Sequence, residues 1–279
     1  MVIQHNISAI NSYRNLGINS GNLSKNLEKL SSGYKINRAG DNAAGLAISE
    51  QMRSQINGLN QAVSNAEDAI GLIQTAEGAL TETHSMLQRM TTLMTQAANG
   101  TYASAADKNT TARENIGEEL KQLAEEIDRI ANNTDFNGIK PMSKDVAPGS
   151  KMTFQIGPSS GETIKVEKQK MTASQLQVKN LKVSDTGMAN GHIKTIKNAI
   201  DTVSMYRAKL GAAQNRLEYT VRNLEVSSEN ITAAESRIRD TDMADEITQY
   251  TKNNILLQAA QSMLTQANAT PQGVLSMLQ

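Results

Sequence analysis

Two long stretches of the chain carry apolar residues seven positions apart. One series runs through residues 196–238 and the other through residues 52–94, and neither is interrupted. The members are Ile196, Val203, Leu210, Leu217, Leu224, Ile231 and Ile238, and Met52, Leu59, Ala66, Ile73, Leu80, Leu87 and Met94. A seven-residue apolar repeat forms a stripe along one face of an α-helix. Both stretches are therefore predicted to be long amphipathic helices that bury their stripes against other helices.

A third, shorter helix is predicted between these two. Thr111 and Glu114 have the spacing of a helix-capping box. The apolar stripe that follows consists of Ile116, Leu120, Leu123, Ile127 and Ile130. The run Asn132-Asn133-Thr134 then indicates the end of the helix, as Asn99-Gly100 does for the helix before it. Three helices of this kind predict a rod-like bundle.

The middle of the chain has a different character. Residues 152–157 and 162–166 alternate apolar and polar side chains on either side of Pro158-Ser-Ser-Gly161. Alternation with a period of two, interrupted by turn residues, is typical of a β-hairpin. The predicted fold class is thus mostly α, an elongated bundle with a small β-hairpin region.

Composition narrows the possible functions. Apolar residues make up 38% of the chain and aromatic residues 3%, with no Trp, which favours helix-on-helix packing over an enzyme cleft. The formal net charge is zero, so nothing indicates binding to nucleic acid or to a membrane surface. Cysteine is absent, which excludes disulfides and thiolate metal sites. No stretch approaches the ~20 apolar residues of a membrane helix, and residues 1–15 lack the order of a cleaved secretory signal.

No catalytic, metal or cofactor site is expected. His5, His84 and His192 are far apart, and none belongs to a metal-binding motif. Residues 40–45 contain two glycines, but no Gly-Lys-Ser/Thr follows as a phosphate-binding loop would require. We therefore expect the chain not to be an enzyme.

The two ends of the chain are predicted to pair. Residues 1–40 hold five basic side chains and one acidic one, whereas residues 240–279 hold four acidic and one basic. Their apolar residues include Ile3, Ile7, Ile10, Leu16, Leu23 and Leu27 at one end, and Ile247, Leu257, Leu264, Leu275 and Leu278 at the other. Opposite charge favours association and correct register. We hypothesise that both ends are loose in the monomer and become ordered when copies pack together.

Five motifs resemble bacterial flagellin. They are residues 3–10 (IQHNISAI), 30–48 (LSSGYKINRAGDNAAGLAI), 133–138 (NTDFNG), 236–247 (SRIRDTDMADEI) and 264–275 (LTQANATPQGVL). Because the region between them is short, the chain is similar to a minimal flagellin without large variable outer domains.

The resemblance implies a division of the chain. The N- and C-terminal core-layer helices would be residues 1–42 and 243–279. The rod would comprise residues 43–142 and 187–242, and a short variable region would span residues 143–186. In this family the terminal helices pair as a coiled coil that lines the filament core. The filament-core residues would therefore be the eleven apolar residues at the two ends named above.

The resemblance also implies function and partners. Flagellins are exported by a flagellar type III route and polymerise into the extracellular filament used for motility. The expected partners are other copies of the chain, filament cap and junction proteins, and an export chaperone on the C-terminal helix. That chaperone would act on the apolar stripe from Ile247 to Leu278.

A Toll-like innate immune receptor recognises the rod surface of flagellins. The matching residues here are Gln88, Arg89, Leu93 and Glu119. Arg89 and Leu93 lie about 200° and about 240° around the helix from Leu87 at ~100° per residue, so both are expected to point outward. This chain has Thr91-Thr92 where the family typically has an Arg-Glu pair. An ordinary solvated rod face is the alternative interpretation.

Two other functions are compatible with the sequence. A hook–filament junction protein would share the terminal helices and the export route, and its copy number per filament would distinguish it. A soluble helical binding protein would instead form a stable monomer that does not polymerise.

Overall fold

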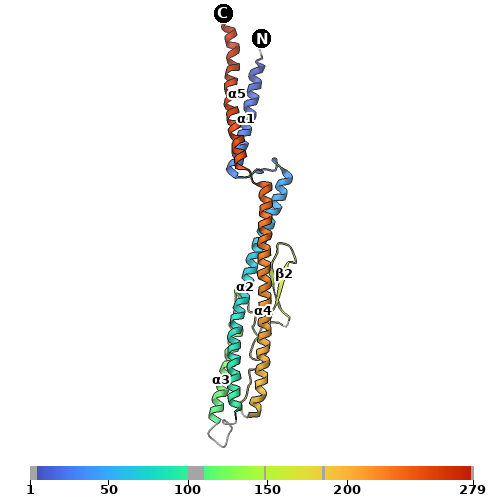
Figure 1. The fold of residues 1–279 in the computed structure, drawn as a ribbon, viewed down its shortest axis with the longest axis vertical. Coiled ribbons are helices and arrows are strands. Elements are labelled where there is room, and N and C mark those ends of the chain that lie inside the picture. Colours follow the sequence, from blue (N-terminus) through green and yellow to red (C-terminus); the bar gives the residue numbers. More distant parts are fainter. Residues whose placement is uncertain (1–4, 100–109, 148, 184–185, 278–279) are drawn as a thin grey trace. The chain divides into compact units, whose positions relative to one another are not determined.

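The computed structural model describes residues 5–99, 110–147, 149–183 and 186–277, which form five helices and one hairpin (Figure 1). The helices are α1 (Ile7–Ser32), α2 (Ala43–Ala98), α3 (Thr110–Asn133), α4 (Thr186–Arg239) and α5 (Met243–Met277). The strands are β1 (Lys151–Gln155) and β2 (Thr163–Glu167). The prediction of a mostly helical chain with a small hairpin is confirmed.

The chain divides into two compact units. The terminal unit consists of residues 1–56 and 229–279, and the central unit consists of residues 57–228. Helices α2 and α4 contribute to both. Helix α2 begins at residue 43 and α5 at residue 243. The expected division into core-layer helices and rod stays a prediction.

The seven-residue stripes form the core of the central unit. Buried members are Leu59, Ala66, Ile73, Leu80, Leu87 and Met94 on α2, and Ile196, Val203, Leu210, Leu217 and Leu224 on α4. The members that lie in the terminal unit, Met52, Ile231 and Ile238, are only half-buried. Each fully buried aliphatic side chain contributes roughly 1.5–3 kcal/mol to stability. The stripes therefore stabilise mainly the central unit.

Helix α3 covers the C-terminal half of α2 in this unit. Ile116, Leu120 and Ile127 of its predicted stripe are buried, whereas Leu123 and Ile130 are half-buried. The helix ends where Thr134 Oγ1 donates to the carbonyl of Ile130 at 2.7 Å. The side chain of Thr111 lies outside the described residues, so the expected capping box stays a prediction.

The hairpin lies against α2 and α4 (Figure 1). Strands β1 and β2 pair antiparallel with Lys151 opposite Glu167 and Gln155 opposite Thr163. Because side chains alternate along a strand, Met152, Ile164 and Val166 are buried while their neighbours face solvent. The turn packs so closely on α2 that a Cβ atom at Gly58 would lie 2.7 Å from Pro158 Cβ. A glycine at position 58 therefore lets the hairpin approach the helix.

Helices α1 and α5 lie side by side and antiparallel in the terminal unit (Figure 1). Asn6 Nδ2 donates to the carbonyl of Ala267 at 2.7 Å, and Lys29 Nζ lies 3.7 Å from Glu246 Oε2. Helix α1 ends at Gly33, whose left-handed φ of 75° allows its N–H to donate to the carbonyl of Lys29.

Candidate functional site

The contact between α1 and α5 is a coiled-coil seam in which apolar and polar positions alternate along α1. On α1 its positions repeat every seven residues, as does the facing series on α5. The α1 members are Ala9, Leu16, Leu23 and Leu30, and Ser12, Asn19 and Asn26. The α5 members are Glu246, Asn253, Ala260 and Ala267, and Tyr250, Leu257, Leu264 and Pro271. The apolar members bury surface between the helices, and the polar members must find partners there.

Asn26 is the best-partnered polar residue of this seam. Its amide nitrogen donates to Glu246 Oε1 at 3.1 Å, and its amide oxygen accepts from Asn253 Nδ2 at 3.0 Å and from Tyr250 N at 3.2 Å. Glu246 is itself buried and also lies beside Lys29. Sliding the helices by one turn would leave these buried groups without partners, which costs about 1–3 kcal/mol per group. The Asn26 cluster therefore sets the register of the pair.

A second set of apolar residues on these helices faces away from the seam. Ile7 and Ile10 are 65% and 62% exposed, and Ile18 lies on the same side of α1. On α5, Ile247, Ile255 and Met263 are exposed as well. Each helix therefore presents one apolar set to its partner helix and another set outward. We call Ile7, Ile10, Ile18, Ile247, Ile255 and Met263 the outer apolar surface.

The structure sorts the predicted filament-core residues into these two sets. Leu16, Leu23, Leu257 and Leu264 lie in the seam, whereas Ile7, Ile10, Leu27 and Ile247 are exposed. Ile3, Leu278 and the side chain of Leu275 lie outside the described residues. Sequence reasoning missed the polar seam residues Asn19 and Asn26, although the seven-residue steps from Ser12 to Asn19 and from Asn19 to Asn26 are the signal that identifies them.

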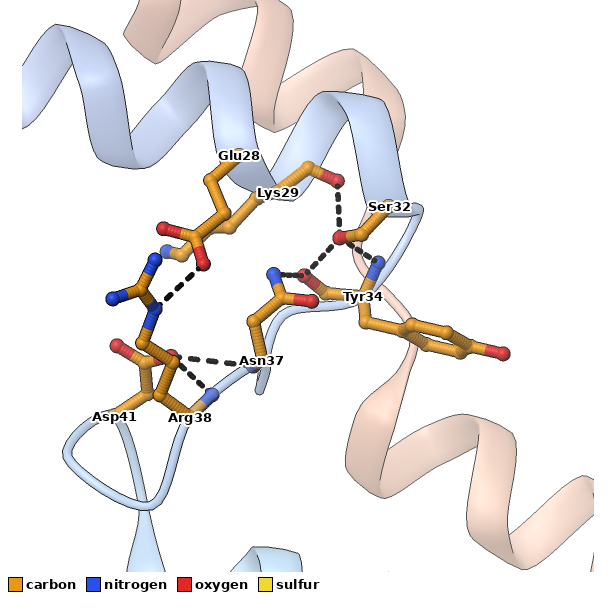
Figure 2. Close-up of polar contacts among 7 residues, drawn as sticks. All are labelled: Glu28, Lys29, Ser32, Tyr34, Asn37, Arg38 and Asp41. Carbon is orange, nitrogen blue, oxygen red and sulfur yellow. Dashed lines mark hydrogen bonds and ion pairs between the residues drawn. The ribbon is translucent and has the colours of Figure 1, made fainter.

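The loop between α1 and α2 is built from short-range hydrogen bonds (Figure 2). Asp41 Oδ2 accepts from the backbone N–H groups of Arg38 at 3.0 Å and Asn37 at 3.2 Å. These two hydrogen bonds lower the pKa of Asp41 because they stabilise its charged form, and the one from the Arg38 N–H has the larger effect. The Nε of Arg38 donates to Glu28 Oε1 at 2.9 Å, which raises the pKa of Arg38. The loop thus returns to the end of α1 in a defined conformation.

A second set of contacts holds this loop from the other side. Lys35 N donates to the carbonyl of Arg239 at 2.7 Å, and Thr241 N donates to the carbonyl of Gly33 at 3.0 Å. The Arg239 guanidinium lies 4.6 Å from the centre of the Tyr34 ring, within cation–π range. The same group forms a 2.8 Å ion pair with Glu50 of α2. Arg239 of α4 therefore joins the loop after α1 to α2 within the terminal unit.

The predicted receptor-facing residues lie in the central unit, and Leu93 corrects our expectation. Arg89 and Glu119 are exposed in part and form a 2.8 Å ion pair between α2 and α3. Gln88 Nε2 lies 3.0 Å from His84 Nε2. Leu93, expected to point outward, is only 2% exposed.

The position of α3 explains why Leu93 is buried. Leu87, Met90, Leu93, Met94 and Ala97 are all buried on α2, over an arc of about 120° at ~100° per residue. Leu87 lies at one edge of that arc and Leu93 at the other, so an angle taken from Leu87 alone places Leu93 on the outer side. Both α3 and α4 pack against α2, so the buried arc on α2 is wider than one stripe.

The described residues provide no obvious site for chemistry. Within them, no three His, Asp or Glu side chains gather closely enough to hold a metal ion. None of the helices in the described part of the chain is long and apolar enough to cross a membrane. The terminal unit instead exposes the apolar side chains of the outer apolar surface.

Comparisons with known proteins identify the family. Residues 3–146 match the bacterial flagellin N-terminal helical region, and residues 193–278 match the bacterial flagellin C-terminal helical region. Flagellin from Bacillus subtilis (strain 168) is 47% identical, and flagellin from Halalkalibacterium halodurans is 48% identical. The flagellar filament 33 kDa core protein of Treponema phagedenis is 47% identical. Each of these matches covers all of both chains.

A solved structure agrees with these matches. The crystal structure of Bacillus cereus flagellin is 30% identical with a TM-score of 0.50, and the match covers 62% of this chain and 94% of that one. A putative flagellar hook-associated protein from Vibrio parahaemolyticus shares the fold, with a TM-score of 0.58 at 13% identity over 72% of this chain and 100% of that one. Two family regions and full-length relatives near 47% identity show that the chain belongs to the bacterial flagellin family.

Proposed function

We propose that this flagellin is a structural subunit that polymerises into the extracellular flagellar filament for motility, and that polymerisation buries the outer apolar surface of α1 and α5. The observation that carries the proposal is the exposure of Ile7, Ile10 and Ile18 on the side of α1 opposite the seam. Aliphatic side chains gathered on one exposed face are typical of a protein–protein contact. No catalytic role is assigned to the chain.

The geometry of the terminal unit suits a polymer. Two antiparallel helices can bury only one face of each against the other, so their remaining apolar residues need a further partner. When the patches that meet on two copies are different, the contact repeats without closing and produces an open helical filament. Each aliphatic side chain that such a contact buries adds roughly 1.5–3 kcal/mol at full burial.

We further propose that the terminal helices become ordered on assembly. A two-helix pair whose seam contains the polar residues Ser12, Asn19, Asn26, Glu246 and Asn253 has little core, and isolated helices are marginally stable in water. Ordering on binding would prevent free subunits from polymerising early. Amide hydrogen exchange of dilute monomer tests this idea. Fast exchange in α1 and α5 is expected, and strong protection there would contradict it.

The remaining partners follow from the family and from the exposed residues of α5. An export chaperone on the C-terminal helix would cover Ile247, Ile255 and Met263 before type III export. Filament cap and junction proteins would contact the same terminal helices at the ends of the filament. Binding of a purified chaperone to the full chain and to Ile255→Asp would test the chaperone assignment, with loss of binding expected for the variant.

We also propose the α2–α3 surface around Arg89 as a Toll-like receptor contact. Arg89, Gln88 and Glu119 remain accessible there, whereas Leu93 would act only by supporting the surface from below. Arg89→Ala should weaken receptor binding about tenfold, as truncation of an arginine anchor commonly does. Unchanged affinity would favour the alternative of an ordinary solvated face.

Seeded polymerisation tests the main function. Purified chain is mixed with short filament fragments, pelleted and viewed by negative-stain microscopy, beside the variants Ile7→Asp and Leu257→Asp. We expect long filaments from the wild-type chain and none from either variant, while urea unfolding of the central unit is unchanged. Asn15→Asp places the same charge on α1 outside the outer apolar surface and serves as the matched control.

Two results would overturn this assignment. Normal growth by both variants would show that the terminal helices do not carry the contact. Absence of growth by the wild-type chain would instead favour a junction protein, which needs a different template, or a soluble helical binding protein.

A further inference from the structure

A strongly basic surface lies on the central unit, although the whole chain has no net charge. Residues 140–182 contain eight Lys and only three acidic residues. Most of these residues belong to the hairpin and its flanking loops, which lie beside α4 (Figure 1). Because like charges repel, such a concentration is stable only where solvent or a partner of opposite charge screens it.

Two of these lysines, Lys151 and Lys165, line a hollow of about 270 Å³ together with residues of α4. Its polar lining consists of Lys151, Lys165, Glu167, Tyr206, Lys209 and Arg216. The Glu167 carboxylate is shared between Lys151 Nζ at 3.9 Å and Lys209 Nζ at 3.5 Å. Within the described part of the chain, Lys165 and Arg216 form no ion pair. The hollow therefore holds more positive charge than its own carboxylate neutralises.

The fold fixes the positions of these charges. Lys151, Lys165 and Glu167 occupy the outward-facing positions of the two paired strands, because Met152, Ile164 and Val166 occupy the buried ones. Tyr206 forms the floor at 1% exposure, and its hydroxyl donates to the carbonyl of Glu167 at 3.1 Å. Arg216 is on α4, ten residues beyond Tyr206. A strand pair anchored to a helix thus presents a preorganised cationic surface.

The opposite charge is found on α3 of the same unit. Residues 110–133 contain six acidic and three basic side chains. Glu114, Glu118 and Glu125 are exposed and lie within about 40° of one another around the helix at ~100° per residue. Lys121 Nζ lies 3.7 Å from Glu118, whereas Glu114 and Glu125 form no ion pair in the described part of the chain. We call these three residues the acidic face of α3.

We propose that the basic hollow formed by the hairpin and α4 binds the acidic face of α3 of a second copy in the filament. The proposal rests on the proposed function, because it names a contact within the polymer. Two different surfaces of opposite charge on one subunit form a heterologous contact, which is the kind that propagates without closing. Charge complementarity contributes to encounter rate and register more than to affinity, so this contact would align subunits that the apolar surfaces hold together.

Charge reversal with a compensating change tests the proposal. Lys165→Glu with Arg216→Glu should slow growth on wild-type seeds about tenfold or more, because steering becomes repulsion. Glu114→Lys with Glu125→Lys should slow growth similarly. The chain that carries all four substitutions should grow on seeds of its own kind at close to the wild-type rate. Lys194→Glu with Lys197→Glu makes the same charge change at exposed positions of α4 outside the hollow and should have little effect.

Two further measurements distinguish loss of the proposed contact from misfolding of the variants. The neutral variant Lys165→Gln with Arg216→Gln should grow more slowly than wild type and lose most of its dependence on NaCl concentration. Far-ultraviolet circular dichroism and urea unfolding of every variant should match those of the wild-type chain, since neither cation forms an ion pair within the described residues.

The outcomes separate the inference from the proposed function. If the wild-type chain grows and the reversed variants grow equally well, the contact is overturned while the filament function stands. If the hollow reversal slows growth but the fourfold variant is not restored, α3 of a second copy is not the partner. A wild-type chain that fails to grow on seeds overturns the filament function and this contact with it.

Discussion

Ile10 provides the clearest measure of how much the outer apolar surface contributes to assembly. Its side chain is 62% exposed and lies on the side of α1 that faces away from α5. Full burial of an aliphatic side chain contributes roughly 1.5–3 kcal/mol, so about 1–2 kcal/mol is still to be gained when a second copy covers it. Ile10→Ala keeps part of that area, and the expected loss is therefore about 1 kcal/mol per contact.

That loss corresponds to a rise of about fivefold in the critical concentration for polymerisation, since 1.4 kcal/mol is a factor of ten. The measurement is the concentration of unpelleted protein after seeded growth at several total concentrations. Urea unfolding of the dilute monomer should change by less than about 0.5 kcal/mol, as is usual for exposed positions. Leu16→Ala is the control, because Leu16 is an apolar seam residue of α1 and its truncation should weaken the α1–α5 pair itself.

The reasoning would be refuted by an unchanged critical concentration for Ile10→Ala. It would also be refuted if the monomer lost stability to the same degree as assembly, because the side chain would then be packed within the subunit.

The other predictions concern the central unit and the loop after α1. Leu217→Ala should destabilise the chain by about 2–5 kcal/mol in urea unfolding, because a fully buried stripe residue leaves a cavity; a change below about 1 kcal/mol would contradict the described core. Burial raises the pKa of Tyr206 from 10.0 to about 12. Its contribution to the free energy of unfolding is therefore complete below pH 10 and is lost as the pH rises toward 12, because the unfolded chain then loses the phenol proton more readily. Between pH 10 and pH 12 the free energy of unfolding should fall by about 2 kcal/mol more for the wild-type chain than for Tyr206→Phe. If the two chains lose stability in parallel over this range, the tyrosine is not buried. The pKa of Asp41 is lowered from 3.8 by the backbone N–H groups of Arg38 and Asn37, so its contribution is present above that value and is lost as the pH falls through the folded-state pKa. The protection factors of the Asn37 and Arg38 amides, taken against the intrinsic exchange rate at each pH, should therefore fall at acidic pH, and Asp41→Asn should remove this change in protection. Identical protection profiles would show that the carboxylate does not hold the loop.

Much of the fold could be predicted because it repeats along the chain. The stripes of α2 and α4 are strictly periodic, and the residues of those stripes in the central unit are buried as expected. The hairpin could be predicted from Pro158-Ser-Ser-Gly161 and the alternation around it, which local turn chemistry explains. The end of α3 was similarly visible in Asn132-Asn133-Thr134.

Burial was predicted less well for side chains on helices that can pack against more than one other helix. Leu93 was expected outside because the angle from one stripe takes no account of a third helix, and α3 covers it. The apolar residues of α1 were predicted as one group, yet Leu16 faces α5 and Ile10 faces outward. Periodicity shows which side of a helix is apolar, but the number and position of packed neighbours decide how wide the buried arc becomes.

By itself, the sequence determined the long helices, the hairpin and the family, because each depends on spacing or composition within a short segment. Only the tertiary structure decided which partner each side chain has. It placed Asn26 in the seam beside Glu246. It also brought Tyr34 and Glu50 into contact with Arg239, and Lys165 and Arg216 to the same hollow. The most distant of these pairs, Asn26 and Glu246, are 220 positions apart, and local propensity carries no information over that distance.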